Sequence, residues 1–531
     1  MRVTPLDYLI AGAYLLGMLL MAARLARRQR SDKDYFVGGR NLPWWALGLS
    51  TLATQSSANS FIGIPAFVAL VPGGGLVWLQ YEIALPLALA VVALVLVPVF
   101  RGLGLISVFE YLELRFDRST RQWLSAVFLL SRGLATAVAL YATALVVSVL
   151  TGWSLTTSVL VAGGVTVAYD LMGGMRAVVW SDVLQMALIL VGLVLCIGYA
   201  VTLAGGWQAV VMAVEPDRLA AVSLGHGLGD GDRAPLWGFV IGGFVLYVAY
   251  YGVDQTQVQR QLSARSVADA QRVLVANAML RFPLTALYAV LGLALAAALL
   301  QSPALRQAVP ADRPDLLVPR FIELHLPMGL RGLLLVALLA AAMSSLDSAL
   351  NSLAAATLED FVQKPGAPAR RSLRQSRLCT LAWGVLITWG ALSVGHAATG
   401  VVETINRVGA MFYGPLLAAF LCGLFLRRAT GRAVRRGVLS GLLCNLAAWW
   451  LLGTQLFWMW WNVTGLVVAV LTVWVLSPRG ASTTAAPSVS KATRLPPAGK
   501  GFLATRSLLV LMTALSVLIA ITLLGLGWRS P

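Results

Sequence analysis

The sequence STLATQSSANSFIGIP, residues 50–65, lies in the middle of an apolar stretch that is long enough to cross a lipid bilayer. Its first part is crowded with polar residues, and a glycine and a proline follow them: Thr51, Thr54, Gln55, Ser56, Ser57, Asn59 and Ser60, then Gly63 and Pro65. Each polar group left unpaired in hydrocarbon costs several kcal/mol. Hydroxyls that bond their own helix, or that let two helices approach closely, account for only a few of them. The run therefore favours a broken helix that lines a water-filled cavity.

A second polar run, LLAAAMSSLDSALNSL at residues 338–353, lies in another apolar stretch. Its small residues recur at steps of three and four, so they share one helical face: Ala341, Ser344, Ser345, Ser348 and Ser352. Tight helix packing explains the alanine and some serines, but it does not explain the carboxylate of Asp347 at membrane depth. A broken helix frees carbonyl oxygens and the serine face supplies hydroxyls, which together make an oxygen cage with little fixed charge. Because hard cations prefer oxygen ligands, the two runs predict a sodium site.

The chain as a whole has the composition of a polytopic membrane protein. Of its 531 residues 59% are hydrophobic and 12% are charged, against roughly 25% charged in a soluble domain. The net charge of +18 comes from basic residues in short loops between apolar blocks, which is typical of cytoplasmic loops and not of a nucleic-acid surface. The cysteines lie in or beside apolar stretches and are interpreted as packing residues. These features exclude a soluble enzyme, a disulfide-rich secreted scaffold and a disordered chain.

Fourteen membrane spans are predicted, and the loops between them carry an orientation signal. With the N-terminus outside, the loops assigned to the cytoplasm hold about four basic residues for each one assigned outside. The first span is followed, not preceded, by its basic cluster, which is not the pattern of a cleaved signal peptide. The predicted spans are 4–23, 43–70, 76–100, 123–150, 156–172, 178–204, 235–258, 273–300, 329–358, 379–398, 403–426, 437–453, 456–476 and 507–528.

Two further acidic residues lie near or within spans. Asp182 lies near the cytoplasmic start of the sixth span, where it either caps that helix or binds an ion. Glu82 lies inside the third span, where an ion pair with Arg132 or Arg281 would neutralise it. These arginines are equally suited to an anionic substrate, and the two roles do not exclude each other. The histidines are scattered and predict no metal cluster.

Several ordered motifs resemble the signature of the sodium:solute symporter family. They are DYFVGGR (34–40), FEYLELRF (109–116), YDLMGGMRAVVWSDVLQ (169–185), YYGVDQTQVQR (250–260) and AAMSSL (341–346). The resemblance runs from about residue 5 to about residue 440. It implies an all-α polytopic membrane protein with a LeuT-like core of two inverted five-helix repeats and alternating access to a site near the midplane.

On this resemblance one helix precedes the repeats and three follow them. The chain then divides into 1–42 (N-terminal transmembrane helix and basic cytoplasmic loop), 43–204 (first repeat), 205–234 (outer loop), 235–426 (second repeat), 427–476 (two accessory helices), 477–506 (cytoplasmic linker) and 507–531 (last transmembrane helix).

The same resemblance implies how sodium is held. The main site of such families uses carbonyls of the first repeat helix and a small-residue triplet of the eighth core helix. Carried over residue by residue, these are the carbonyls of Ala53 and Ser56, together with Ala341, Ser344 and Ser345. Some members bind a second sodium near the equivalents of Asp182, Ser344, Asp347 and Ser348. Asp347 stands where some of those members carry serine, which leaves the second site open in detail.

The substrate positions match the sugar-transporting members poorly. Glu82 is retained and Tyr250 matches their inner aromatic gate, but other positions differ: Ser60 for Gln, Tyr247 for Asn, Arg281 for Lys and Asn406 for Gln. Ser57, beside the predicted break, completes the candidate substrate set. The stretches YYGVDQ (250–255) and GPLL (414–417) look closer to the iodide, multivitamin and monocarboxylate branch. With Arg132, Arg281 and Arg407 in or near the bundle, the resemblance favours a small organic anion.

The resulting prediction is a multi-pass sodium symporter of the plasma (inner) membrane that imports a small organic anion such as a carboxylate or vitamin, with Na+ as coupling ion. A sugar or amino-acid symporter, and proton coupling through Asp182 or Asp347, stay open as alternatives. A sensor would need an output domain after the core, and a membrane enzyme would need a catalytic constellation, so both are remote and no catalytic residue is assigned. The expected partners are the solute and the lipid bilayer, and no feature calls for nucleic acid or for an obligate protein partner.

Overall fold

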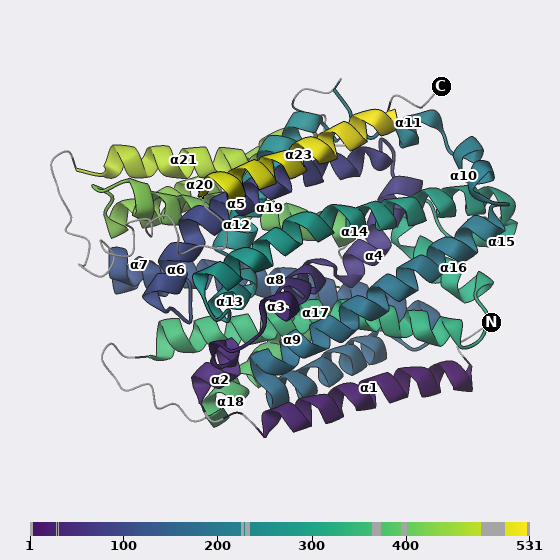
Figure 1. The fold of residues 1–531 in the computed structure, drawn as a ribbon, viewed down its shortest axis with the longest axis horizontal. Coiled ribbons are helices and arrows are strands. Elements are labelled where there is room, and N and C mark those ends of the chain that lie inside the picture. The colour runs from purple at the N-terminus through teal and green to yellow at the C-terminus, as the bar shows by residue number, and fades with distance from the viewer. Residues whose placement is uncertain are drawn as a thin grey trace.

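The interrupted span and the helices around it are seen in a computed structural model that describes residues 4–27, 29, 31–224, 228, 234–363, 373–394, 401–478 and 505–527. Within these residues every regular element is a helix, apart from an isolated β-bridge between Leu42 and Ala264. The long helices run side by side (Figure 1). Eight of the described helices are long and apolar enough to cross a membrane, and three shorter ones are also apolar. The predicted all-α membrane fold is confirmed at this level.

The N-terminal half contains the broken span and two very long helices. Its elements are α1 (Pro5–Ala26), α2 (Asp32–Val37), η1 (Gly38–Arg40), α3 (Trp44–Gln55), α4 (Ala58–Ala69), η2 (Leu76–Ala84), α5 (Leu85–Val91), η3 (Val92–Leu96), α6 (Val97–Leu103), α7 (Glu110–Arg115), α8 (Arg118–Thr151), α9 (Leu155–Leu203), α10 (Trp207–Ala213) and α11 (Pro216–Leu219). The predicted spans 156–172 and 178–204 are the two arms of α9. They meet at Gly174, whose φ of 50° and ψ of −159° only glycine adopts readily.

The C-terminal half repeats the pattern of long helices joined by short ones. Its elements are η4 (Gly238–Gly242), α12 (Gly243–Gly252), α13 (Gln255–Leu262), α14 (Val267–Gln301), α15 (Pro303–Ala308), η5 (Pro314–Leu316), α16 (Leu317–His325), α17 (Leu330–Thr357), η6 (Leu358–Val362), α18 (Leu373–Val394), α19 (Val401–Phe425), α20 (Gly431–Leu452), η7 (Gly453–Gln455), α21 (Trp460–Leu476) and α23 (Thr505–Gly527). Several helices begin before the predicted spans, at Arg118, Leu373 and Gly431. A helix satisfies its own backbone, so it continues past the apolar stretch into the polar layer where arginines are solvated.

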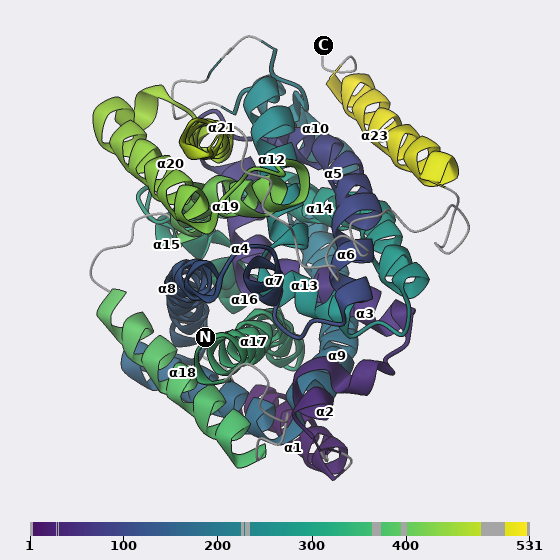
Figure 2. The same ribbon diagram turned by 90° about the vertical axis from the view of Figure 1, so that its left-hand side faces the viewer.

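The helix that carries the serine face lies in the middle of the packing. α17 contacts α8, α9, α1, α18, α3 and α4, and Figure 2 shows it surrounded by α8, α18 and α9. α14 packs against both α3 and α4 from another side. The broken helix and the serine face are therefore neighbours, as the two polar runs predict.

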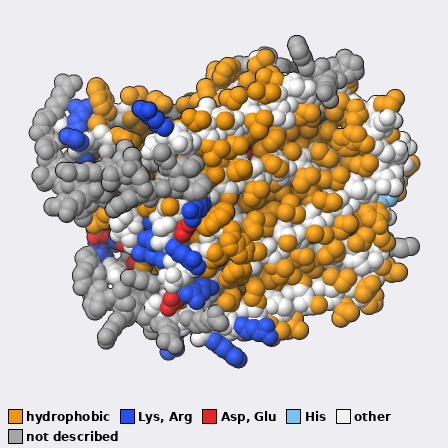
Figure 3. All heavy atoms as spheres, in the orientation of Figure 1, with side chains coloured by type: hydrophobic (Ala, Val, Ile, Leu, Met, Phe, Trp, Pro, Cys, Tyr) orange, Lys and Arg blue, Asp and Glu red, His pale blue; other side chains and the backbone are white. Residues whose placement is uncertain are grey.

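The molecular surface divides into a broad apolar belt and one basic end. Figure 3 shows hydrophobic side chains over most of the visible face, while arginine and lysine side chains gather at the left end. α1 begins and α23 ends at the opposite end (Figure 1). This distribution is the one expected of a membrane protein whose basic end faces the cytoplasm.

Candidate functional site

The break in the second span lies between Gln55, the last residue of α3, and Ala58, the first residue of α4. Ser56 (φ −89°, ψ 64°) and Ser57 (φ −74°, ψ 171°) both leave helical geometry. The predicted interruption is confirmed at the predicted serines. The Ser56 N–H still donates to the carbonyls of Leu52 and Ala53, both at 3.0 Å, and closes the last turn of α3. A carbonyl oxygen has two lone pairs, so oxygens at this helix end can also accept from side chains or bind ions.

The serine face of α17 meets those carbonyls. The Ser344 hydroxyl lies 3.1 Å from the Ala53 carbonyl oxygen and 3.0 Å from the Ala341 carbonyl oxygen. The Ser345 hydroxyl donates to the Thr54 carbonyl at 3.0 Å. Ser344 is fully buried. Carbonyl oxygens of the broken helix and hydroxyl oxygens of the serine face thus lie together between α3 and α17.

The residues expected at a second sodium site surround a guanidinium group. Arg260 Nη2 lies 3.0 Å from Asp182 Oδ2, and it also donates to the Ser348 hydroxyl. Arg260 Nε donates to the Ser50 hydroxyl at 2.7 Å, and that hydroxyl donates to Asp182 Oδ2 at 2.5 Å. Arg260 is 1% exposed. Asp182 lies eight residues beyond the Gly174 turn, so it is an ion-pair partner and not the cap of a helix.

Asp347 lies at the edge of the same cluster. It accepts hydrogen bonds from the Tyr169 hydroxyl and, at 3.1 Å, from the Ser348 hydroxyl. The Ser348 hydroxyl, which accepts a hydrogen bond from Arg260, therefore links the second buried carboxylate to the guanidinium that pairs with Asp182. Sequence reasoning missed Tyr169 and Arg260, although both lie inside quoted motifs, because a motif does not say which side chains meet in space.

A cavity of about 190 Å³ adjoins the helix break. It is lined by part of the predicted substrate set, namely Ser57, Ser60, Tyr250 and Arg281, and by the predicted anion contact Arg132. Sequence reasoning missed several other wall residues: Gln55, Trp78, Thr136, Thr143, Thr166, Tyr413 and Trp458. One signal was available, because Arg132, Thr136 and Thr143 recur at four- and seven-residue steps and so share a face of α8.

Arg132 has an incomplete set of partners at the cavity wall. Its Nη1 lies 3.5 Å from Asp254 Oδ2, which also accepts a hydrogen bond from the Tyr413 hydroxyl at 3.1 Å. The guanidinium lies 6.0 Å from the ring centroid of Tyr250. Arg132 Nε is buried and makes no hydrogen bond. A buried donor without an acceptor is costly, so this wall is suited to an incoming oxygen anion.

Arg281 is placed in a similar way in another wall. Its Nε lies 3.4 Å from Glu82 Oε1, yet neither Nε nor Nη1 makes a hydrogen bond. Glu82 Oε1 instead accepts a hydrogen bond from the Thr285 hydroxyl at 3.0 Å. The predicted pairing of Glu82 is confirmed with Arg281, while Arg132 pairs with Asp254.

Two predicted substrate residues lie behind the cavity wall. Glu82 and Tyr247 are fully buried and do not line the cavity. The Tyr81 ring, which does line it, stacks on the Tyr247 ring with centroids 4.3 Å apart. Arg407 also lies outside the cavity wall, and the side chain of Asn406 lies outside the described residues.

Comparison with known proteins gives a consistent set of relatives. A model of the sodium:solute symporter family matches residues 35–444. The chain is 32% identical to the human sodium/iodide cotransporter over 81% of this chain and 66% of that protein. It is 29% identical to sodium-coupled monocarboxylate transporter 1 of Xenopus laevis over 86% of this chain and 73% of that protein. It is also 29% identical to the sodium/sialic acid symporter NanT of Aliivibrio fischeri over 89% of this chain and 93% of that protein.

Solved structures agree on the fold. A Na+-coupled sialic acid symporter in a substrate-bound outward-open state superposes with a TM-score of 0.80 at 26% identity, over 90% of this chain and 99% of that chain. Mhp1, a nucleobase-cation-symport-1 family transporter, superposes with a TM-score of 0.52 at 14% identity, over 86% of this chain and 97% of that chain. The second likeness concerns the fold alone.

Proposed function

The chain belongs to the sodium:solute symporter family, and from that membership we propose that it imports a small organic anion together with sodium by alternating access. The relatives named above are transporters of iodide, of monocarboxylates and of sialic acid. These solutes are chemically different but all are anions. Their common charge supports a cavity that offers positive groups to the solute. Because these relatives are transporters, they also support the proposal that this chain transports its solute without chemical change.

Sodium would be held between α3 and α17. The ligands we propose are the carbonyls of Ala53, Ser56 and Ala341 and the hydroxyls of Ser344 and Ser345. The short distances from the Ser344 hydroxyl to the carbonyls of Ala53 and Ala341 support this choice. Without a cation, the Ser344 hydroxyl proton is shared between these two carbonyl oxygens. When a sodium ion binds, the hydroxyl proton can turn away, so that the hydroxyl and carbonyl oxygens all direct lone pairs at the ion.

The ion at this place would couple the two gradients. It joins the broken helix to α17, so it stabilises the arrangement in which those helices are close. If that arrangement binds the solute better, each ligand raises the affinity for the other by the same factor. With one sodium ion and one monovalent anion the cycle moves no net charge, so the sodium gradient and not the membrane potential drives uptake.

The solute would bind in the cavity beside Arg132 and Arg281. The observation that carries this assignment is that both arginines line one cavity and both have buried N–H groups without hydrogen-bond partners. Their counter-carboxylates, Asp254 and Glu82, are too distant for good hydrogen bonds at 3.5 Å and 3.4 Å. A carboxylate can complete such donor sets, and Tyr250 and Tyr413 offer ring surface for the rest of a small solute.

One sodium per cycle is proposed in place of the two that some members use. The supporting observation is the Arg260 guanidinium, which already neutralises Asp182 and bonds Ser348. A guanidinium and a sodium ion compete for the same oxygens. The second site at Asp182, Asp347 and Ser348 would become available only if Arg260 moved away.

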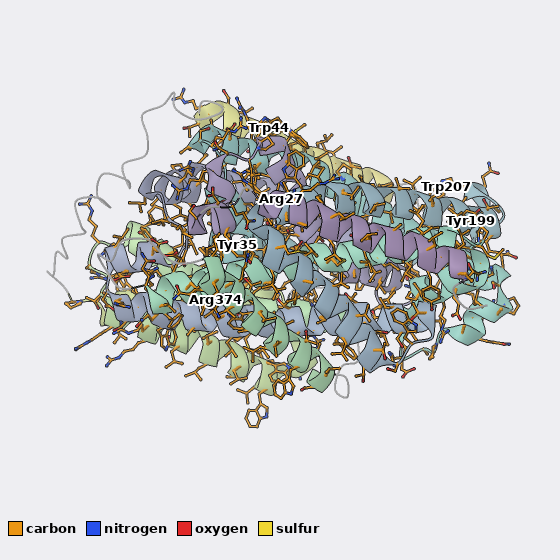
Figure 4. The ribbon with its side chains drawn as sticks, turned by 90° about the horizontal axis from the view of Figure 1, so that it is seen from below. Arg27, Tyr35, Trp44, Tyr199, Trp207 and Arg374 are labelled. Carbon is orange, nitrogen blue, oxygen red and sulfur yellow. The ribbon has the colours of Figure 1, made fainter. Side chains whose placement is uncertain are left out.

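Fourteen spans with the N-terminus outside, in the plasma (inner) membrane, complete the proposal. The basic end in Figure 3 and the common location of the α1 start and the α23 end support this orientation. In Figure 4, Tyr199 and Trp207 lie toward the right end, while Arg374 lies in the left half and Arg27 lies near the middle. The repeats are proposed at 43–204 and 235–426, and most of the linker 477–506 lies outside the described residues.

Uptake into proteoliposomes tests the whole proposal. Purified protein is reconstituted, and sodium and pH gradients are imposed separately with a panel of labelled monocarboxylates, dicarboxylates, sugars and amino acids. We expect uptake of an organic anion that follows the sodium gradient. Uptake that follows only the pH gradient would replace sodium coupling by proton coupling, and uptake of neutral sugars alone would contradict the anion assignment.

A further inference from the structure

The last quarter of the chain has an unusual charge composition. After Glu403 the sequence contains neither aspartate nor glutamate, although it contains many basic residues. Five of them lie close together at the connection between α19 and α20: Arg427, Arg428, Arg432, Arg435 and Arg436. The positive-inside bias requires an excess of basic residues in cytoplasmic loops, but it does not require acids to be missing. The segment therefore supplies no acidic residue of its own to pair with these arginines, and a negatively charged partner would be attracted to them.

A groove lies where this connection meets the end of α21. Its volume is about 380 Å³, and it is lined by Arg428, Trp474, Val475, Leu476, Ser477 and Pro478. The Arg428 guanidinium lies 5.0 Å from the Trp474 ring centroid and donates to the Trp474 carbonyl at 3.2 Å. Val475 is 68% exposed and Trp474 is half-exposed. The groove therefore has one cationic wall and one apolar wall.

Two further arginines lie at the same end of α20. Arg432 and Arg436 are exposed and four residues apart, so they share a helical face. Arg435 is different, because its Nη1 donates to Asp117 Oδ1 of the α8 start at 2.8 Å. α20 and α21 approach closely here: a Cβ added to Gly437 would lie 2.5 Å from the Val473 side chain. The start of α20, which carries these exposed arginines on an adjacent face, thus lies beside the end of α21 and its groove.

We infer that this groove binds the phosphodiester headgroup of an anionic phospholipid from the cytoplasmic leaflet. Arg428 in the groove wall contacts the headgroup, the exposed Arg432 and Arg436 at the start of α20 add positive charge nearby, and the exposed apolar end of α21 contacts the acyl chains. A lipid fits better than free phosphate because the apolar wall continues onto the exposed surface of α21, and tryptophan is typical of the headgroup level. The inference rests on the proposed orientation in the membrane, but not on the identity of the solute.

Native mass spectrometry of the full-length detergent-purified protein tests this inference. The probes are dioleoyl phosphatidylglycerol, dioleoyl phosphatidylcholine with the same acyl chains, and inorganic phosphate as a competitor. We expect the wild-type protein to retain phosphatidylglycerol preferentially. The triple variant Arg428→Gln, Arg432→Gln, Arg436→Gln should lose affinity by roughly fivefold per arginine, which corresponds to about 1 kcal/mol each near an anionic surface.

The matched control is Arg24→Gln, Arg27→Gln at the end of α1, which lies across the molecule from α20 and α21 in both ribbon views. This control should keep the lipid, and circular dichroism should show that every variant is folded. Equal retention of phosphatidylcholine, equal loss in the control, or displacement of the lipid by millimolar phosphate would each overturn the inference. Because these readouts do not involve uptake, a failure here is distinct from a failure of the transport proposal.

Discussion

Arg260 and Asp182 form a buried ion pair, 3.0 Å from Nη2 to Oδ2, among the residues that the sequence resemblance offers for a second sodium ion. The pair connects α13 to the second arm of α9, and the same guanidinium bonds Ser50 on α3 and Ser348 on α17. One side chain therefore joins four helices on one side of the proposed sodium site. Because this fixed positive charge already neutralises Asp182, the carboxylate does not require a second sodium ion.

The first prediction concerns the energetics of this pair. Arg260→Gln leaves Asp182 without its cation, and Asp182→Asn leaves a buried guanidinium, so each single variant should lose roughly 3–5 kcal/mol of stability. The double variant should recover a large part of that loss. Thermal unfolding of the purified proteins measures the effect. Additive losses in the double variant would mean that the two groups do not interact in solution.

A second prediction follows for sodium stoichiometry. With Arg260 in place, the sodium dependence of uptake should have a Hill coefficient of about 1, because one site suffices. The double variant Arg260→Gln, Asp182→Asn keeps this value, since it removes the guanidinium and the carboxylate together. A steep sodium dependence in the wild-type protein would show that a second ion binds despite the guanidinium.

The third prediction addresses the proposed main sodium site. Ser344→Ala and Ser345→Ala remove hydroxyl ligands, each worth roughly 1–3 kcal/mol when its partner groups are left buried. The double variant should therefore raise the sodium concentration for half-maximal uptake by tenfold or more. Solute affinity at saturating sodium should change much less.

Ser352→Ala is the matched control for this experiment. Ser352 lies on the same helix and is also buried, but its hydroxyl bonds the Ala349 carbonyl of its own turn. Its substitution should leave the sodium dependence unchanged. Wild-type sodium dependence in the Ser344, Ser345 double variant would remove the basis of the proposed site.

The break at Ser56 and the serine face of α17 could be predicted from the sequence for one physical reason. Unpaired polar groups are costly in the hydrocarbon of a bilayer. Seven polar residues within ten positions of a membrane span therefore imply an interrupted helix next to water. The pairing of the two segments followed from complementary chemistry, with carbonyls on one side and hydroxyls on the other. In a soluble protein the same serines would have carried almost no information.

The position of Arg260 could not be predicted in the same way. It lies two residues beyond the end of the predicted span 235–258, where an arginine is expected to be solvated in a cytoplasmic loop. The structure instead folds Gln255–Leu262 into a short buried helix, α13, and brings its last turn under α3. Glu82 and Tyr247 lie behind the cavity wall for a related reason: sequence positions do not reveal that the Tyr81 ring stacks on Tyr247 or that Glu82 lies against Arg281.

The fourth prediction concerns solute recognition. Arg132→Lys keeps the positive charge but loses the planar pair of donors that fits a carboxylate. The variant should therefore raise the half-saturating concentration of the anion by roughly tenfold, with little change in sodium dependence. Arg281→Lys, in the other wall, should have a comparable effect if the solute contacts both arginines. Unchanged uptake in both variants would show that the transported anion does not bind to these arginines in the cavity.

The last prediction concerns packing between α19 and α21. A Cβ added to Gly414 would lie 2.1 Å from the backbone carbonyl oxygen of Asn462, so Gly414→Ala forces the two helices apart. Overpacking of this kind costs roughly 1–3 kcal/mol, and the thermal unfolding temperature should fall. Gly198→Ala in α9 is the control, because a Cβ there meets nothing within 4 Å. Alanine favours helices over glycine by about 1 kcal/mol, so the control should be neutral or stabilising. If Gly414→Ala behaved like the control, α19 and α21 would not be in the close contact that places GPLL (414–417) against Asn462.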